Sequence, residues 1–246
     1  MKKLRKLLEK EWIKYGVETF AVLVGVLGAF ALENWRDNLK DRQTEKEYIQ
    51  NLISDIYRQI SIIDEQADFE EIMRTKCEDL ISVLNKTPDD LDDIGKLATS
   101  ISRKTFVVYN PVFEDLKYSG HLSLLSRTQH KNAVLGFYQL AEYVERVLNK
   151  NNAIYADAVT LYLVDHGLAD FGSISDSLTA ASQNFSLDAE SHSGSEEIIA
   201  GNLRNKEMTL VLHNKVAIRG SSSSVHIDLL NRLRTEGESV IEFLSD

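Results

Sequence analysis

The chain has 246 residues, of which 43% are hydrophobic, and it carries only two prolines and a net charge of −10. This length allows one large domain or two small ones, and the scarcity of proline allows long helices. The charge is uneven, because residues 1–16 hold six basic side chains against two acidic ones, a net +4 that leaves −14 on the remainder. An acidic body argues against nucleic acid as a partner, whereas a basic arm suits an anionic lipid surface.

The basic arm, residues 1–14, is followed by the most apolar stretch of the chain. Its uncharged run, Thr19–Leu32, has 14 residues, fewer than the ~20 of a usual membrane span. Trp12 and Trp35 flank this run at a separation of 23 residues. A helix of that length covers about 35 Å, which matches the distance between the two aromatic belts of a bilayer. The pattern predicts a transmembrane helix over residues 15–35 with interface anchors at Trp12, Tyr15 and Trp35.

Two alternatives to a membrane anchor remain open. The run has the length of a core helix, and the triplet at 29–31 is similar to the cleavage site of an export leader. Helical patterning resumes directly after the run, which favours the anchor. Six basic residues precede the span and four follow it within 15 residues. This bias predicts a single-pass topology with a cytoplasmic N-terminus and the body on the other side of the membrane.

One face of the predicted span is lined by small residues and a carboxylate. Small residues let two helix backbones approach closely, which drives helix association in lipid. A carboxylate in a span is costly unless it is paired, hydrated or near the interface. We therefore expect this face to pack against a second copy or another protein's span, the alternative being a lone span with an interfacial glutamate. The face consists of Glu18, Ala21, Gly25, Gly28 and Ala29.

The remainder of the chain predicts an all-α fold in which the transmembrane helix continues into a bundle of long helices. Residues 36–48 are a polar helical stalk, and residues 49–246 form the bundle domain. A second helix is expected over about Glu70–Lys86. The first bundle helix repeats isoleucine at heptad spacing, which predicts a buried seam. That seam is Ile49, Ile53, Ile56, Ile60, Ile63 and Ala67.

The middle of the chain combines an extended connector with the most regular helix. Residues 105–113 are β-branched and aromatic without an obvious pairing partner, so we expect a connector, with Pro111 starting a short helix and Gly120 ending it. Ser126 and Gln129 have the spacing of a capping box. The following helix has apolar residues at alternating steps of three and four, and we expect this seam to pack on the isoleucine seam. Asn151 is the polar residue on it, and it either fixes the register of the helices or lies at the surface. The seam is Val134, Phe137, Ala141, Val144, Leu148, Asn151, Tyr155, Ala158 and Tyr162.

The last third of the chain changes character twice. Residues 168–202 are rich in serine, aspartate and glycine and lose helical periodicity, which predicts a flexible connection. A final helix is expected over Leu203–Leu244, with a solvated bend at the glycine and four serines of 220–224.

No pattern in the sequence predicts catalysis. The six histidines form no helical metal-binding motif, and neither a nucleophile elbow nor a phosphate-binding loop is present. Cys77 is the only cysteine, so it forms no intramolecular disulfide, and it is expected to be a buried core thiol. We predict no enzymatic activity, no catalytic or metal site and no cofactor.

Two stretches resemble a family of uncharacterised single-pass membrane proteins common in Bacteroidota. Residues 17–37, VETFAVLVGVLGAFALENWRD, are similar to that family's span, which follows a glutamate and closes on an Asn-Trp element, here Asn34 and Trp35. Residues 112–125, VFEDLKYSGHLSLL, are similar to its second signature. The resemblance implies a bacterial inner-membrane location and the topology above, and it implies no activity.

Two classes of function are compatible with this pattern. The first is a membrane-anchored helical structural or interaction protein of the bacterial envelope, whose partners are the lipid bilayer and either further copies or another envelope protein. The alternative is an oligomeric membrane sensor or pore-forming effector with a ligand-binding helical domain.

Overall fold

The computed structural model describes residues 2–85, 94, 98, 100–170 and 194–245 of the chain. Every regular element among them is helical, which confirms the all-α prediction. The helices are α1 (Lys2–Leu84), α3 (Pro111–Tyr118), α4 (Thr128–Asn151), α5 (Asp157–Asp165), α6 (Ser195–Leu203) and α7 (Lys206–Ser245). A 3₁₀ turn at His121–Ser123 precedes α4, and a π-helical turn at Asn152–Ala156 joins α4 to α5.

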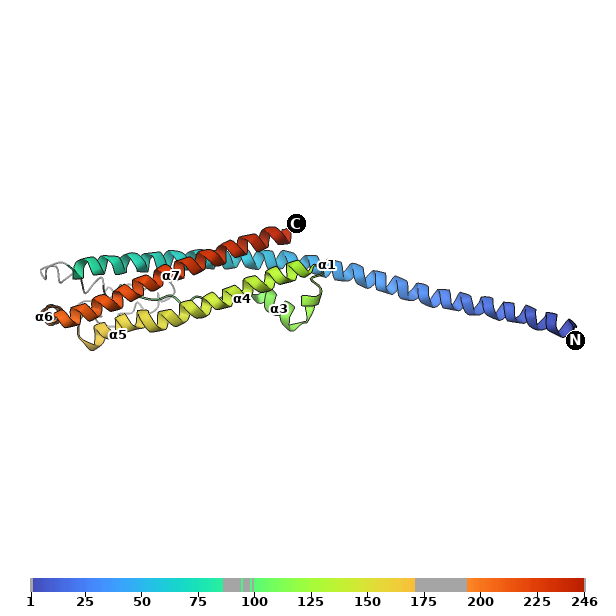
Figure 1. Ribbon diagram of the computed structural model, residues 1–246, viewed down its shortest axis with the longest axis horizontal. Coiled ribbons are helices and arrows are strands. Elements are labelled where there is room, and N and C mark those ends of the chain that lie inside the picture. The colour runs from blue at the N-terminus through green and yellow to red at the C-terminus, as the bar shows by residue number, and fades with distance from the viewer. Residues whose placement is uncertain (1, 86–93, 95–97, 99, 171–193, 246) are drawn as a thin grey trace.

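Three long elements lie side by side as an elongated bundle (Figure 1). They are the second half of α1, the continuous rod of α4 and α5, and α7. The first half of α1 leaves the bundle and projects from it as a single helix. Helix α7 runs antiparallel to α1 and returns the chain to the end from which α1 projects.

Helix α1 runs without interruption from the projecting arm to the far end of the bundle. Its 83 residues span about 125 Å at 1.5 Å per residue. The separate helix predicted over Glu70–Lys86 is wrong, because Glu70 lies inside α1, which ends at Leu84. Between Gly28 and Pro88 the chain contains neither glycine nor proline, so nothing in the sequence breaks the helix.

The buried seam of α1 differs from the predicted isoleucine seam. Ile56 and Ile63 belong to both, whereas Ile49, Ile53, Ile60 and Ala67 are only half-buried. Polar residues occupy three positions of the observed seam. A search for apolar residues alone therefore places part of the seam at the wrong positions of the helix. That seam alternates steps of four and three residues along Leu52, Ile56, Gln59, Ile63, Gln66, Glu70, Met73, Cys77 and Leu80.

The seam of α4 belongs to the same apolar cluster as the seam of α1, and the helix that lies closest to α4 is α7. Phe137, Ala141, Val144 and Leu148 are fully buried in the cluster that contains Ile56 and Ile63. A second apolar cluster fills the far end of the bundle around Cys77, Val159, Leu163, Leu212 and Val216.

The π-helical turn shifts the seam by one residue after Leu148. The uninterrupted repeat placed Asn151, Tyr155, Ala158 and Tyr162 on the buried line, but these residues are only partly buried. A π turn accommodates one extra residue, so each later core position moves one step along the chain. The positions that are buried are Asn152, Ala156, Val159 and Leu163.

The segment before α3 is extended, as expected, and side-chain amides satisfy its backbone. Asn149 accepts from the Phe106 N–H at 3.1 Å and donates to the Phe106 carbonyl at 2.8 Å. Asn152 donates to the Lys104 carbonyl at 3.2 Å. These contacts replace the strand partner that the segment lacks, because buried backbone groups need hydrogen bonds.

The predicted start and end of α3 are confirmed, whereas the capping box of α4 is wrong. Pro111 is the first residue of α3, and Gly120 follows its end with a φ of 77°. No side chain caps α4, and the Ser126 N–H instead donates to Glu45 Oε1 of α1 at 2.6 Å.

The expected bend in the final helix is absent. Helix α7 continues through residues 220–224, and Ser222 and Ser223 are buried. The helix stays straight because these serines lie on its inner face, where the bundle supplies polar partners. Of the connection predicted over 168–202, residues 195–202 belong to α6 and residues 171–193 lie outside the described part of the chain.

Candidate membrane anchor and buried charge network

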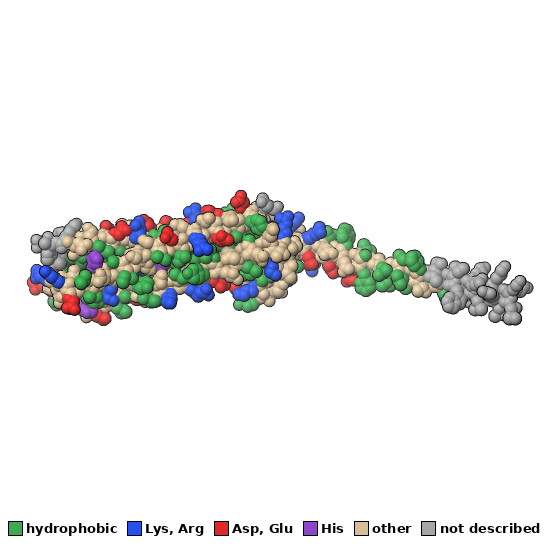
Figure 2. Space-filling view, in the orientation of Figure 1, with side chains coloured by type: hydrophobic (Ala, Val, Ile, Leu, Met, Phe, Trp, Pro, Cys, Tyr) green, Lys and Arg blue, Asp and Glu red, His purple; other side chains and the backbone are tan. Residues whose placement is uncertain are grey.

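The projecting part of α1 exposes its apolar side chains. Phe20, Leu32 and Trp35 are 68%, 67% and 63% exposed, whereas Leu52 and Ile56 farther along the same helix are fully buried. Figure 2 shows these apolar side chains on the arm outside the bundle. Of the described helices, α1 is long and apolar enough to cross a membrane, and its most apolar window has a mean hydropathy of 1.2 with no part buried.

The predicted packing face lies entirely on this uncovered arm. No other part of the described chain covers it, and a Cβ built on Gly25 or Gly28 would have no neighbour within 4 Å. The anchors Tyr15 and Trp35 are also exposed, and the side chain of Trp12 lies outside the described ones. The residues of the face, all exposed, are Glu18, Ala21, Gly25, Gly28 and Ala29.

A polar junction marks the point where α1 joins the bundle. The Tyr48 hydroxyl donates to Asp115 Oδ2 of α3 at 2.8 Å and lies 2.8 Å from Nδ1 of His121. The hydrogen bond to Asp115 raises the pKa of Tyr48. The hydroxyl therefore remains protonated and holds α1 against the α3 corner at the end of the stalk.

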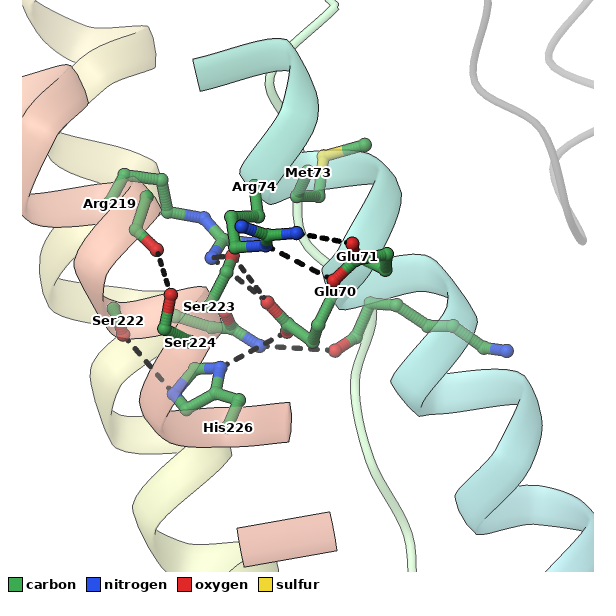
Figure 3. Close-up of polar contacts among 12 residues, drawn as sticks. Glu70, Glu71, Met73, Arg74, Arg219, Ser222, Ser223, Ser224 and His226 are labelled. Carbon is green, nitrogen blue, oxygen red and sulfur yellow. Dashed lines mark hydrogen bonds and ion pairs between the residues drawn. The ribbon is translucent and has the colours of Figure 1, made fainter. Parts of the chain in front are cut away.

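A charge network lies in the middle of the bundle, between α1 and α7 (Figure 3). The side chains of Glu70, Arg219 and His226 are fully buried. Arg219 donates through one terminal nitrogen to Glu70 Oε2 at 3.0 Å, and Nδ1 of His226 lies 3.1 Å from Glu70 Oε1. The two carboxylate oxygens thus face different partners from α7.

Four further polar groups complete the network. Ser223 donates to Glu70 Oε2 at 2.8 Å, and the Ser222 hydroxyl lies 3.2 Å from Nε2 of His226. Arg219 also donates to the Ser102 carbonyl at 3.3 Å, and the Gln66 amide donates to Glu70 Oε1 at 3.4 Å. The network therefore joins α1, α7 and the extended segment.

The charges of Glu70 and Arg219 balance each other. Glu70 supplies one negative charge and Arg219 one positive charge, and Nδ1 of His226 faces the second carboxylate oxygen. Burial alone would raise the pKa of Glu70, but the interaction with His226 and the charge of Arg219 outweigh it and hold the pKa below the ordinary 4.5. Glu70 is consequently ionised at neutral pH, which a buried carboxylate tolerates only when it is fully paired.

Other buried groups lie near this centre. Burial raises the pKa of the Cys77 thiol to about 11, so the thiol stays protonated, which agrees with the predicted core cysteine. The side chains of Glu70, Arg219 and His226 are likewise fully buried. Within the described ranges, no group of three or more His, Cys, Asp or Glu side chains could hold a metal ion.

The network was not predicted from the sequence, because polar residues on long helices are usually at the surface. A usable signal was present, since Arg219, Ser223 and His226 continue the 4–3 spacing of Leu212 and Val216. A polar residue that keeps the apolar rhythm of a helix is a candidate for a buried partner.

No protein-family model, curated protein or solved structure matches this chain. The fold and the two sites define an all-α protein in which one helix is long and apolar enough to cross a membrane. The resemblance to a bacterial membrane-protein family stays a prediction.

Proposed function

We propose that this chain is a membrane-anchored helical structural or interaction protein of the bacterial envelope. Residues 15–35 cross the inner membrane once, residues 1–14 remain in the cytoplasm, and the bundle stands on the other side. The bundle acts by contact with further copies or with another envelope protein, and it carries out no catalysis.

The observation that supports this proposal is the contrast along α1. The helix is covered wherever its seam meets α7, and it is bare over the stretch from Phe20 to Trp35. Each large apolar side chain left in water forgoes about 1.5–3 kcal/mol of burial free energy. A hydrocarbon layer supplies that burial, and a helix satisfies its own backbone there.

The stalk gives the bundle a defined distance from the lipid. Residues 36–48, the stalk, continue α1 with mostly polar side chains, and contacts such as Gln43 Nε2 to Glu47 Oε1 at 2.9 Å support the helix. Because α1 is one unbroken helix, no loop separates the bundle from the proposed span. A continuous helical stalk suits a protein that presents an interaction surface near a membrane.

The small-residue face of the span supports self-association within the membrane. Gly25 and Gly28 leave open space beside the helix, so a second backbone can approach closely. Glu18 lies near one end of the apolar stretch, where a partner or the interface can satisfy its carboxylate.

Fractionation of matched variants tests the anchor. Leu23→Lys combined with Val26→Lys places two charges in the centre of the span, where each costs about 2.5–3.5 kcal/mol in insertion. We expect the double variant to leave the carbonate-washed membrane fraction, while the stalk control Leu39→Lys stays in it. Retention of the double variant in washed membranes would contradict the proposal.

A further inference from the structure

The facing seams of α1 and α7 both follow a strict heptad rhythm. In α1 the buried positions alternate steps of four and three from Leu52 to Leu80, and the helices run antiparallel. The matching seam of α7 is Leu212, Val216, Arg219, Ser223, His226, Leu230, Leu233, Gly237, Val240 and Leu244.

An apolar heptad pattern determines which faces of α1 and α7 meet, but it does not determine how far one helix is shifted along the other. A shift of seven residues, about 10 Å along the axis, returns the same face of α7 to α1 and again pairs apolar residues with apolar residues. Natural helix pairs exclude such alternatives with buried polar residues at single seam positions.

The charge network fits one axial register only. Glu70 faces Arg219, Ser223 and His226 together. After a shift of seven residues, the seam residue opposite Glu70 would be Val216 or Leu230 in place of Ser223. Because Arg219 and His226 are seven residues apart, each shift puts one of them in the place of the other beside Glu70 and buries the second among apolar side chains. Either shift therefore leaves Glu70 with one charged or polar partner fewer and without Ser223, and it buries one polar side chain unpaired, which is a larger penalty than an apolar exchange.

We propose that the Glu70–Arg219–His226 network is a register latch between α1 and α7. It selects one axial position of the two helices and opposes sliding of α1, the helix that also carries the uncovered apolar segment. The latch acts by selecting one register of the two helices, and it contributes little more to the free energy of unfolding than apolar residues at the same positions would. A buried ion pair can often be replaced by apolar residues without loss of stability. This inference stands independently of the membrane role.

An exposed pair of positions provides a reporter of register. Arg234 Nε of α7 lies 3.5 Å from Asp64 Oδ1 of α1, and both side chains are partly exposed. Asp64→Cys with Arg234→Cys therefore reports the native register by oxidant-induced disulfide formation. Tyr57→Cys or Glu71→Cys, each with Arg234→Cys, reports a shift of seven residues in either direction. The native Cys77 does not interfere because it is buried.

The test compares these reporters in the full-length chain with and without the network. The apolar variant is Glu70→Leu with Arg219→Met and His226→Leu, and Ser224→Ala, an exposed change beside the network, is the control. We expect the parent and the control to form only the 64–234 disulfide. The apolar variant should remain helical, unfold cooperatively, and form at least one shifted disulfide as well.

Two results would overturn the latch. A folded apolar variant that forms only the 64–234 disulfide would show that other contacts set the register. An apolar variant that no longer unfolds cooperatively would show that the network supplies stability, and the double variant Glu70→Leu with Arg219→Met checks this with one fewer change. A double variant that also fails to unfold cooperatively, or that crosslinks only at 64–234, would contradict the latch in the same way.

Discussion

At the scale of single residues, Glu70 depends most on its neighbours. Its carboxylate is fully buried and stays ionised because partners from two helices surround it. Exposed ion pairs of the same bundle, such as Arg74 with Glu78 at 3.0 Å, stand in water and contribute little. Losing one partner of an ion pair between a carboxylate and a guanidinium therefore costs far more stability in the buried network than at the surface of the bundle.

Removing Arg219 should be far more harmful than removing an exposed arginine. Arg219→Met leaves the Glu70 charge buried and unpaired, which we expect to cost about 3–5 kcal/mol of unfolding free energy. The control Arg234→Met loses its exposed pairs with Asp64 and Glu238 and should cost at most ~1 kcal/mol. Urea unfolding of the full chain in detergent, followed by circular dichroism, measures both values, and equal losses would refute the ranking.

Acidification should weaken the bundle through Glu70. Because the pKa of Glu70 is held below 4.5 in the folded chain, the folded state binds this proton less readily than the unfolded state does. The stabilisation is therefore complete above pH 4.5 and is lost as the pH falls through the lower folded pKa.

The measurement compares unfolding free energies of the parent and of Glu70→Gln between neutral pH and pH ~3, below the ordinary range of a glutamate. The amide variant cannot titrate at this position, so its stability should fall less steeply below the ordinary pKa of 4.5 than that of the parent. Parallel curves for the two chains would show that Glu70 contributes nothing to the acid sensitivity.

At the scale of elements, two glycines of α7 set how closely it approaches its neighbours. A Cβ built on Gly237 would lie 3.0 Å from Phe137 Cε2 and 3.3 Å from Ile56 Cγ2. A Cβ on Gly220 would lie 3.1 Å from the Cβ of Cys77. Helix α7 therefore packs into α1 at two levels, one on each side of the charge network.

Gly237→Ala and Gly136→Ala form a matched pair of changes within helices. The methyl group at 237 crowds two core side chains and should cost about 1–3 kcal/mol. At 136 on α4 a Cβ meets nothing within 4 Å, so the higher helix propensity of alanine should stabilise by up to about 1 kcal/mol. Thermal unfolding of both variants measures the difference, and a stabilising change at 237 would disprove the close approach.

The elements that were predicted well from the sequence are those with local signals. Helix α3 begins at Pro111 and is followed by Gly120. The proline ring and the left-handed glycine conformation each act locally on the backbone, so both helix ends can be predicted from the sequence. The seam from Val134 to Leu148 is apolar throughout, so its periodicity is sufficient.

The errors arise where tertiary contacts decide. Gln59, Gln66 and Glu70 lie on the buried seam of α1 because distant parts of the chain bind them, and no local pattern reveals those partners. The π turn likewise shows no local signature, although it moves the core from Tyr162 to Leu163. The buried serines of α7 were missed for the same reason.

At the scale of the whole molecule, α1 connects the proposed anchor to the bundle. The same helix carries the bare apolar stretch, the stalk, the Tyr48 junction and Glu70. No loop or helix break separates these features along α1.

The central claim is that residues 15–35 hold the bundle on the far side of a membrane from the basic arm. Reporters fused after Asp246 test it most directly in bacterial cells. We predict that a reporter active only in the periplasm works and that one active only in the cytoplasm fails, with both fusions found in washed membranes. The reverse pattern, or a mature chain that begins at Leu32 after cleavage of a leader, would contradict the account.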